Sequence, residues 1–270
     1  QKATAYPGVQ AWTTLTEALQ DPAIDAVYVA SPVLFHAEHT LASLRAGKHV
    51  LCEKPVAMNF PEAQAMAAEP RHNGQLLGVA YFRRLFPKLL RAKQLLAEGV
   101  IGQPVLVEAN CHGWLESEER AWLRDPALAG GGPLYDIGSH RIDAFNFLFG
   151  QPVSATGLRS NAVHQMGVED SATILIGYAH GIRGIVDVRW NSRVRRDQFR
   201  VIGTEGELVL DPLQGAPLRY NGTEEDLPSH PNVHAPLLTN FTAAALDGAP
   251  LACPLEQAIW TDWVTAQVLK

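Results

Sequence analysis

The first hundred residues alternate between short apolar runs and longer helical patterns. Strands are predicted at Ile24–Ala30 (IDAVYVA), His49–Glu53 (HVLCE) and Leu76–Tyr81 (LLGVAY), and the first of them is an apolar run apart from Asp25, as expected of a strand buried on both faces. Helical patterns separate them, the first over residues 36–45 and ended by Gly47. Because parallel strands need long crossover connections, this alternation is typical of βαβ units. The sequence therefore predicts a parallel sheet in this part of the chain.

A different pattern begins after a predicted helix at about residues 87–98. Strands dominate residues 153–221, and several of them, such as Ser171–Ala179, alternate apolar with polar residues. Such alternation is typical of antiparallel strands with one covered face. The change predicts two domains: residues 1–103 with a parallel α/β sheet, and residues 104–270 with an α+β fold around a large, mostly antiparallel open sheet.

Composition narrows the range of partners. Hydrophobic residues make up 47% of the 270 residues and charged residues 19%, which excludes a disordered or collagen-like chain. Lys and Arg number 22 against 28 Asp and Glu, and they are scattered, so neither nucleic acid nor membrane is an expected partner. Cys52, Cys111 and Cys253 are isolated, which favours a reducing, cytoplasmic location over a disulfide framework. Small molecules or other protein chains are the expected partners.

Polar side chains follow all three predicted strands of the first domain. Ser31-Pro32 follows the first strand, Glu53-Lys54 the second and Arg83-Arg84 the third. Parallel sheets bind ligands at the carboxyl ends of their strands, so these groups should share one edge. A Glu-Lys pair is more often a solvated ion pair, but its place directly after a buried strand favours a site. Lys54 precedes Pro55, which makes their peptide bond a candidate for the cis isomer.

A second group of candidate residues lies at a glycine-rich turn and the helix after it. Beyond Gly130–Gly132, Asp136 and His140 are four residues apart, which puts both on one face of an α-helix. A histidine is suited to accept a proton near neutral pH, and a neighbouring carboxylate orients it. The alternatives are a solvated Asp/His pair and half of a metal site. A metal would need two more ligands, and no other pair of residues looks committed to that task, so no metal is expected.

Two blocks of the sequence resemble one known protein family. The first block comprises Ser31-Pro32-Val33, His36, Ala46–Val50 (AGKHV) and Glu53-Lys54-Pro55, and the second comprises Gly130–Gly132, Asp136, Gly138 and His140. Together they resemble the Gfo/Idh/MocA family, the relatives of glucose–fructose oxidoreductase and inositol dehydrogenase.

The resemblance implies an NAD(P)-dependent oxidoreductase with a Rossmann-type dinucleotide-binding domain and a substrate domain. The open sheet of the second domain would also join subunits into a homodimer or homotetramer. The reaction would transfer a hydride between the nicotinamide and a hydroxyl or carbonyl carbon of a sugar, cyclitol or related small molecule. Two alternatives are an NAD-dependent glycosidase of the same architecture and a non-catalytic ligand sensor.

The resemblance also implies roles for individual residues. Lys54 would lie between the nicotinamide and the substrate hydroxyl, His140 would act as general acid/base, and Asp136 would hold the substrate or the imidazole. The cofactor, NAD or NADP, would be bordered by Ser31, Pro32, His36, Glu53 and Lys54. The candidates for the substrate pocket are Arg84, Trp122 and Arg124, and the alternative for Trp122 is a packing role.

One family feature has no counterpart in the sequence. Members of the family open with a strand, a GxGxxG loop and a helix, and no GxGxxG occurs here. Since one βα unit takes roughly 30 residues, about 60 residues of the dinucleotide-binding domain are expected to precede Gln1, so that this domain is partial in the sequence. Val33 also replaces the family's usual Asn, which would remove a hydrogen bond to the cofactor.

Overall fold

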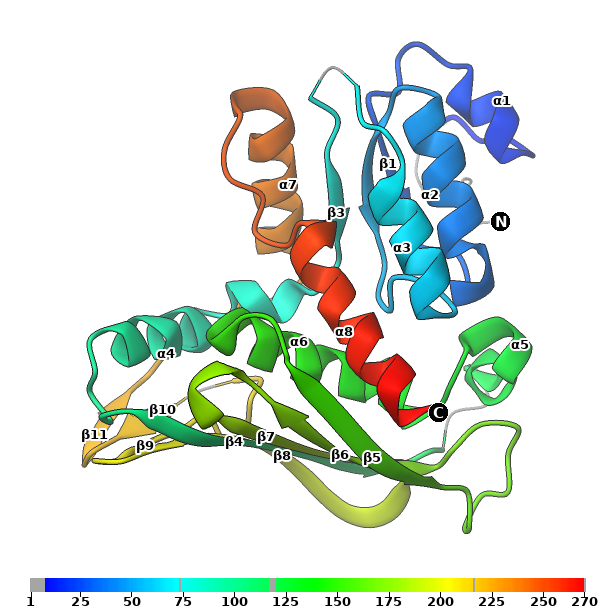
Figure 1. Cartoon of the computed structure of the whole chain (residues 1–270). Helices are drawn as coiled ribbons and strands as arrows, with labels where there is room; N and C mark the ends of the chain where they lie inside the picture. Colours follow the sequence, from blue (N-terminus) through cyan, green and yellow to red (C-terminus); the bar gives the residue numbers. More distant parts are fainter. Residues whose placement is uncertain (1–7, 73, 117–119, 216, 270) are drawn as a thin grey trace.

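The chain forms two β-sheets with helices between and around them (Figure 1). The computed structural model describes residues 8–72, 74–116, 120–215 and 217–269. The smaller sheet consists of three parallel strands in the order β1-β2-β3: β1 (Ala26–Val29), β2 (His49–Cys52) and β3 (Leu77–Val79). Helix α1 (Leu15–Leu19) precedes it, and α2 (His36–Arg45) and α3 (Phe60–Ala68) connect its strands. The parallel sheet predicted from the sequence is confirmed.

Strand β1 lies at an exposed edge of this sheet. The apolar run predicted a strand buried on both faces, yet Ala26 is exposed and Tyr28 is 43% exposed. The order β1-β2-β3 leaves one side of β1 without a strand among the described residues, whereas β2 and β3 are almost wholly buried. The prediction of two covered faces was therefore wrong for β1.

Local signals fix the ends of the helices around the small sheet. The Thr14 hydroxyl accepts a hydrogen bond from the Glu17 backbone N–H, and the Glu17 carboxylate accepts one from the Thr14 N–H, which forms a capping box at α1. The Asn59 side chain accepts a hydrogen bond from the Glu62 N–H at 3.0 Å and caps α3. Gly47, with a φ of +82°, follows α2 and lets the chain turn into β2.

The larger sheet has eight strands and is antiparallel except for one pair. Its order is β11-β10-β9-β8-β4-β7-β6-β5, and only β4 and β7 run parallel. The strands are β4 (Pro104–Trp114), β5 (Ser154–Ser160), β6 (Ser171–Gly177), β7 (Arg183–Arg189), β8 (Asn191–Gly203), β9 (Glu207–Val209), β10 (Leu218–Tyr220) and β11 (Thr223–Glu225). The large, mostly antiparallel sheet predicted for the second half of the chain is confirmed.

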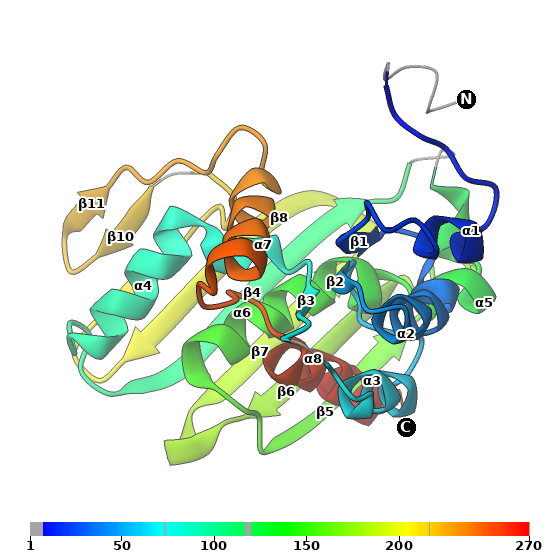
Figure 2. The same cartoon turned by 90° about the horizontal axis from the view of Figure 1, so that it is seen from above.

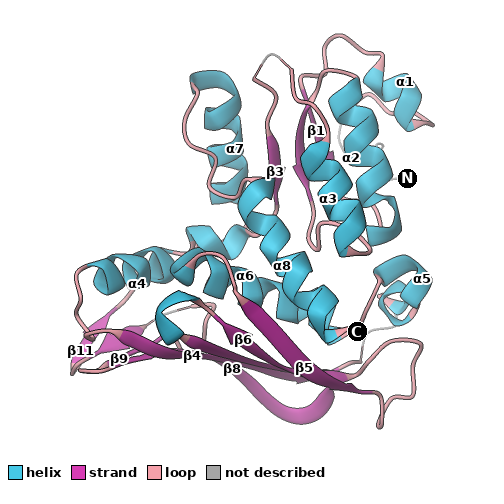
Figure 3. Ribbon diagram, viewed as in Figure 1, coloured by secondary structure: helices cyan, strands magenta, loops and turns pink. Residues whose placement is uncertain are grey.

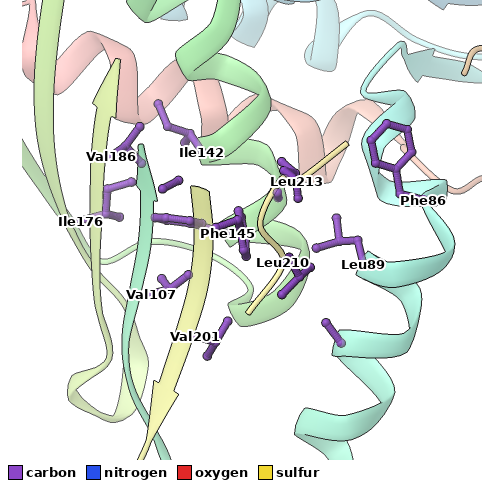
Figure 4. Packing of buried hydrophobic residues seen from close by; sticks show 14 of the residues in the cluster. Phe86, Leu89, Val107, Ile142, Phe145, Ile176, Val186, Val201, Leu210 and Leu213 are labelled. Atoms are coloured by element: carbon purple, nitrogen blue, oxygen red, sulfur yellow. The ribbon is translucent and has the colours of Figure 1, made fainter. Parts of the chain in front are cut away.

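Helices cover one face of the larger sheet. Helices α4 (Pro87–Ala97), α6 (Ser139–Phe149) and α8 (Leu255–Val268) lie on this face, as Figures 1 and 2 show, and Figure 3 shows none of the described helices on the opposite face. The core between helices and sheet includes Leu89, Ile142, Phe145, Val186 and Val201, all fully buried (Figure 4). The remaining helices are α5 (Pro126–Ala129) and α7 (Ala235–Asp247). None of the helices in the described ranges is long and apolar enough to cross a membrane.

Helix α8 contacts the cores of both sheets. Leu255 and Ile259 in its first half belong to the buried cluster of the smaller sheet, whereas Val264 and Val268 belong to the cluster of the larger sheet. Strand β4 begins at Pro104, where the sequence predicted a domain boundary. Because α8 returns to the smaller sheet, the division into residues 1–103 and 104–270 stays a prediction.

Candidate active site

Lys54 connects the two parts of the chain at the carboxyl end of β2. Lys54 follows this strand closely. Its peptide bond to Pro55 is cis, as the sequence suggested. The Lys54 Nζ donates hydrogen bonds to the Asp136 backbone oxygen at 2.8 Å and to Asp136 Oδ1 at 3.1 Å. Asp136 stands just before α6, so this ion pair brings together the two groups of residues that the sequence singled out.

Asp136 also accepts a hydrogen bond from a second cation. The Arg120 Nη2 donates to Asp136 Oδ1 at 3.0 Å. Burial alone would raise the pKa of Asp136, but the charges of Lys54 and Arg120 and their hydrogen bonds hold that pKa below its usual value. The carboxylate is therefore ionised at neutral pH. Arg120 was not predicted as a site residue, because nothing in the sequence around it marks a ligand-binding motif.

No hydrogen bond or ion pair joins Asp136 to His140 among the described residues. Residues Leu134–Gly138 form a π-helical turn in front of α6, and this wider turn changes the relative direction of two side chains four residues apart. The Asp136 carboxylate bonds to Lys54 and Arg120 instead. The prediction that α-helical spacing lets Asp136 orient the imidazole was therefore wrong.

His140 is buried against the aromatic residues that follow β3. Its ring centroid lies 5.0 Å from that of Phe82 and 5.8 Å from that of Tyr81. Its Nδ1 is buried and has no hydrogen-bond partner among the described residues. Burial, followed by the charges of Arg83 and Lys54, lowers the pKa of His140 well below its usual value. The imidazole is therefore neutral at neutral pH and has a nitrogen that can accept a proton.

Most of the residues predicted to border the cofactor share one cavity. A cavity of about 190 Å³ is bordered by Ser31, His36, Glu53 and Lys54 from the ends of β1 and β2, and by Trp122 and Asp136 from the second part of the chain. Pro32 and His140 are not among the bordering residues. The cavity lies where parallel α/β sheets bind nucleotides.

Hydrogen bonds fix the two loops that form this cavity. The His36 Nδ1 lies 2.8 Å from the Pro55 oxygen, and its Nε2 lies 2.9 Å from the Ser31 oxygen. The Glu53 carboxylate accepts hydrogen bonds from the Tyr28 hydroxyl and, at 3.1 Å, from the Lys54 N–H. His36 is 1% exposed and both its nitrogens face carbonyl groups, so it joins the loops after β1 and β2.

The glycine-rich turn lets the chain pass close to Glu169. Gly130, with a φ of +75°, ends α5. A Cβ atom on Gly132 would lie 2.0 Å from the Glu169 backbone oxygen. The Glu169 carboxylate accepts hydrogen bonds from the backbone N–H groups of Gly132 at 2.8 Å and Leu134 at 3.1 Å. Glu169 therefore holds the start of the π-helical turn that carries Asp136.

The three residues predicted for the substrate pocket do not come together. Arg84 is 1% exposed and forms an ion pair with Asp143 at 2.6 Å, so its placement at the pocket was wrong. Trp122 borders the cavity and is 36% exposed. Arg124 lies at the end of the 3-10 turn Ala121–Arg124 and is not among the residues that border the cavity. Within the described ranges, no three His, Cys, Asp or Glu residues lie together so that they could hold a metal ion.

Comparison with known proteins places this site in a family. Residues 1–81 match the oxidoreductase family with an NAD-binding Rossmann fold, and residues 89–209 match the GFO/IDH/MocA C-terminal domain. The chain is 31% identical to 1,5-anhydro-D-fructose reductase of Ensifer adhaerens over 258 residues, which cover 92% of this chain and 78% of the reductase. It is also 31% identical to trans-1,2-dihydrobenzene-1,2-diol dehydrogenase of Bos taurus over 228 residues, which cover 82% of this chain and 66% of that enzyme.

A solved structure agrees with these sequence relatives. GenD2 from gentamicin A biosynthesis, in complex with NAD, superimposes with a TM-score of 0.85 and 26% sequence identity, covering 99% of this chain and 81% of GenD2. The family that the sequence resembled is thus confirmed by family matches in both halves of the chain, by relatives and by fold. The chain belongs to the Gfo/Idh/MocA family of oxidoreductases, whose first domain is an NAD-binding Rossmann fold.

Proposed function

We propose that this protein transfers a hydride between NAD or NADP and a hydroxyl- or carbonyl-bearing carbon of a sugar, cyclitol or related small molecule. The observation that supports this most directly is the Lys54–Asp136 ion pair in the cavity at the carboxyl ends of β1 and β2. Two relatives are named for the reduction of an anhydro sugar and the dehydrogenation of a vicinal diol, which supports a substrate with neighbouring oxygen-bearing carbons.

In this proposal three side chains divide the proton chemistry. NAD, when bound, supplies the hydride acceptor for oxidation. As the C–H hydride leaves the carbinol carbon and the C=O bond forms, the hydroxyl proton must go to a base. His140 accepts that proton because its imidazole is neutral. The Lys54 ammonium stabilises the negative charge that develops on the oxygen, and Asp136 positions that ammonium through its hydrogen bond.

Substitution of Lys54 tests the proposal. Lys54→Met should lower turnover of a polyol by about 10²–10³-fold, the usual loss for one donor at a developing oxyanion, while nicotinamide fluorescence still reports cofactor binding. Lys48→Met is the matched control. Lys48 lies in the turn before β2, at the opposite end of that strand from Lys54, and its Nζ donates a hydrogen bond to the Asp21 backbone oxygen. Parental turnover in Lys54→Met would refute the assignment. Hydrolysis of a glycoside without net nicotinamide reduction would instead identify a glycosidase.

We further propose that the uncovered face of the larger sheet joins subunits into a homodimer or homotetramer. Leu158 and Leu175 are 82% and 51% exposed on this face, and Leu175 pairs across the sheet with Ile185. An uncovered sheet face that carries exposed leucines supports burial against a second copy. Sedimentation velocity should show an oligomer for the parent and a smaller species for Leu175→Glu. Leu246→Glu, on the exposed side of α7, should sediment like the parent; a monomeric parent would contradict the proposal.

A cytoplasmic location is inferred from the cysteines. Cys52, Cys111 and Cys253 are free thiols, and Cys52 and Cys253 are buried in the structure. Buried free thiols are compatible with a reducing compartment, where disulfides are rare.

A further inference from the structure

Two arginines near His140 lack partners for most of their nitrogens. Arg83 lies in the 3-10 turn Phe82–Leu85 after β3, and Arg141 follows His140 in α6. The Nε and Nη1 atoms of both arginines are buried and have no hydrogen-bond partner within the described residues. Buried guanidinium groups normally find acceptors, because a desolvated donor without one is unfavourable. Four unpartnered donors in one region indicate that a ligand provides the acceptors.

Phe82 brings Arg83 and the two histidines together. The Arg83 Cζ lies 4.8 Å from the centroid of the Phe82 ring. The ring centroids of His140 and His234 lie 5.0 Å and 4.5 Å from that of Phe82. Arg141 is 3% exposed, and its Nη2 alone is engaged, with Asp197 Oδ1 at 2.5 Å and Cys111 Sγ at 3.3 Å. The free nitrogens of Arg83 thus belong to a side chain that packs on the same phenylalanine ring as the proposed acid/base.

The charges in this region do not balance. Asp197 pairs with Arg141, whereas Arg83 makes no ion pair in the described part of the chain. Burial, and after it the charge of Arg141, lowers the pKa of Arg83 to about 9. Arg83, Lys54 and Arg141 also act on His140 and lower its pKa. Of the two guanidinium groups, that of Arg141 therefore has a counter-charge and that of Arg83 lacks one within the described ranges.

We propose that Arg83 and Arg141 bind a carboxylate of the substrate, so that the substrate class is the sugar acids and related polyol carboxylates. This inference rests on the proposed function, because it places the carboxylate beside the carbon that exchanges hydride. A planar carboxylate matches the forked donors of a guanidinium group. It also carries a single negative charge, as the unpaired Arg83 requires, whereas a phosphate ester carries nearly two.

The first test compares matched sugars in steady-state kinetics with NAD. Hexuronates and aldohexoses differ by a carboxylate in place of a hydroxymethyl group, and hexose phosphates test the doubly charged alternative. The parent should have a higher kcat/KM for uronates than for the other two classes. Arg83→Met should lower the uronate-to-aldohexose ratio of kcat/KM by about ten- to hundredfold, the loss expected for a charge-assisted hydrogen bond. Arg141→Gln should lower it in the same direction.

Arg219→Met is the control for a lost surface charge. Arg219 is exposed on β10 and pairs with Glu224, so this variant should keep the parental ratio. Equal kcat/KM for uronates and aldohexoses in the parent, or a preference for hexose phosphates, would overturn the inference. The inference is also overturned if Arg83→Met lowers kcat/KM for charged and neutral sugars equally.

Thermal unfolding tests the site without any turnover. Because the buried nitrogens of Arg83 have no partners, Arg83→Met should unfold at the same temperature as the ligand-free parent or higher; a lower temperature would indicate a structural arginine and overturn the inference. A hexuronate should raise the Tm of the parent but not of the variant. If that shift occurs and no sugar is oxidised or reduced, the proposed function fails while the carboxylate site stands. If neutral sugars turn over and uronates give no shift, the inference alone fails.

Discussion

His140 is surrounded by groups that keep its imidazole uncharged. Burial lowers its pKa first, and the positive charges of Arg83 and Lys54 lower it further. Oxidation of a polyol requires the neutral imidazole, because only that form accepts a proton. We therefore expect kcat/KM for oxidation to stay constant through neutral pH and to fall only well below about 6.5, the ordinary value for histidine. Initial rates of nicotinamide reduction as a function of pH measure this profile.

The origin of this pH dependence can be tested at Arg83. Arg83→Met removes one positive charge near His140, so the acid limb of its profile should move to higher pH than in the parent. Arg219→Met, which removes a charge from exposed β10, should leave the limb in place. An acid limb at or above the ordinary histidine value in the parent would show that another group accepts the proton.

Residues next to the strand ends were predictable from the sequence, whereas contacts between distant segments were not. Lys54 stood out because it follows a buried strand, and its pairing with Asp136 joins two motifs that lie 82 positions apart. Arg84 stood out too, but only the fold shows that Asp143 neutralises it inside the protein. Arg83 differs from Arg84 by one position, and no sequence pattern distinguishes the unpaired guanidinium from the paired one.

Among the elements, the central strand β4 was not predicted from the sequence. It lies between β7 and β8, and its inward residues Val107 and Ala109 are fully buried. Glu108 and Asn110 alternate with these apolar residues, as expected of a strand. However, the strand begins with a proline and its buried side chains are small, which weakens the sequence pattern that predicts a strand. The π-helical turn Leu134–Gly138 was concealed for a different reason, because its hydrogen bonding depends on how Glu169 holds the preceding glycines.

The turn before α6 should tolerate no side chain at Gly132. An added Cβ would lie 2.0 Å from the Glu169 backbone oxygen, so the β6 end or the turn must move. Gly132→Ala should lower the free energy of unfolding by about 1–3 kcal/mol, the usual cost of overpacking, and should also reduce turnover because the π-helical turn carries Asp136. Urea unfolding and initial rates measure the two effects.

Gly113 offers a matched control within β4. No heavy atom lies within 4 Å of a Cβ built on Gly113, and its φ is not in the left-handed region. Gly113→Ala should therefore keep the parental stability or exceed it slightly, since alanine loses less backbone freedom on folding. If Gly132→Ala and Gly113→Ala unfolded at the same urea concentration, the close approach of Glu169 would not limit this turn.

At the scale of the whole molecule, a buried ion pair helps to hold the two sheets together. The Arg84 Nε and Nη2 donate to the Asp143 carboxylate at 2.9 Å and 2.6 Å, and its Nη1 donates to Gln257 at 2.9 Å. Arg84 thereby joins the segment after β3 to α6 and α8. Burial alone would lower the pKa of Arg84, but the Asp143 carboxylate holds it above its usual value. Burial raises the pKa of Asp143, and the positive charge of Arg84 opposes that rise, so each charge depends on the other inside the protein.

Removal of one member of this pair should cost far more than removal of both. Arg84→Met leaves the Asp143 carboxylate buried without its partner, so the free energy of unfolding should fall by about 3–5 kcal/mol. In Arg84→Met/Asp143→Leu no charge is left uncompensated, and much of that loss should be recovered. Arg45→Met, which breaks the exposed pair with Glu69, should barely change the urea midpoint. The losses in free energy of unfolding from Arg84→Met and from Asp143→Leu could instead simply add in the double variant. In that case the ion pair would contribute nothing specific to holding the sheets together, and the packing of α8 against both cores would be sufficient.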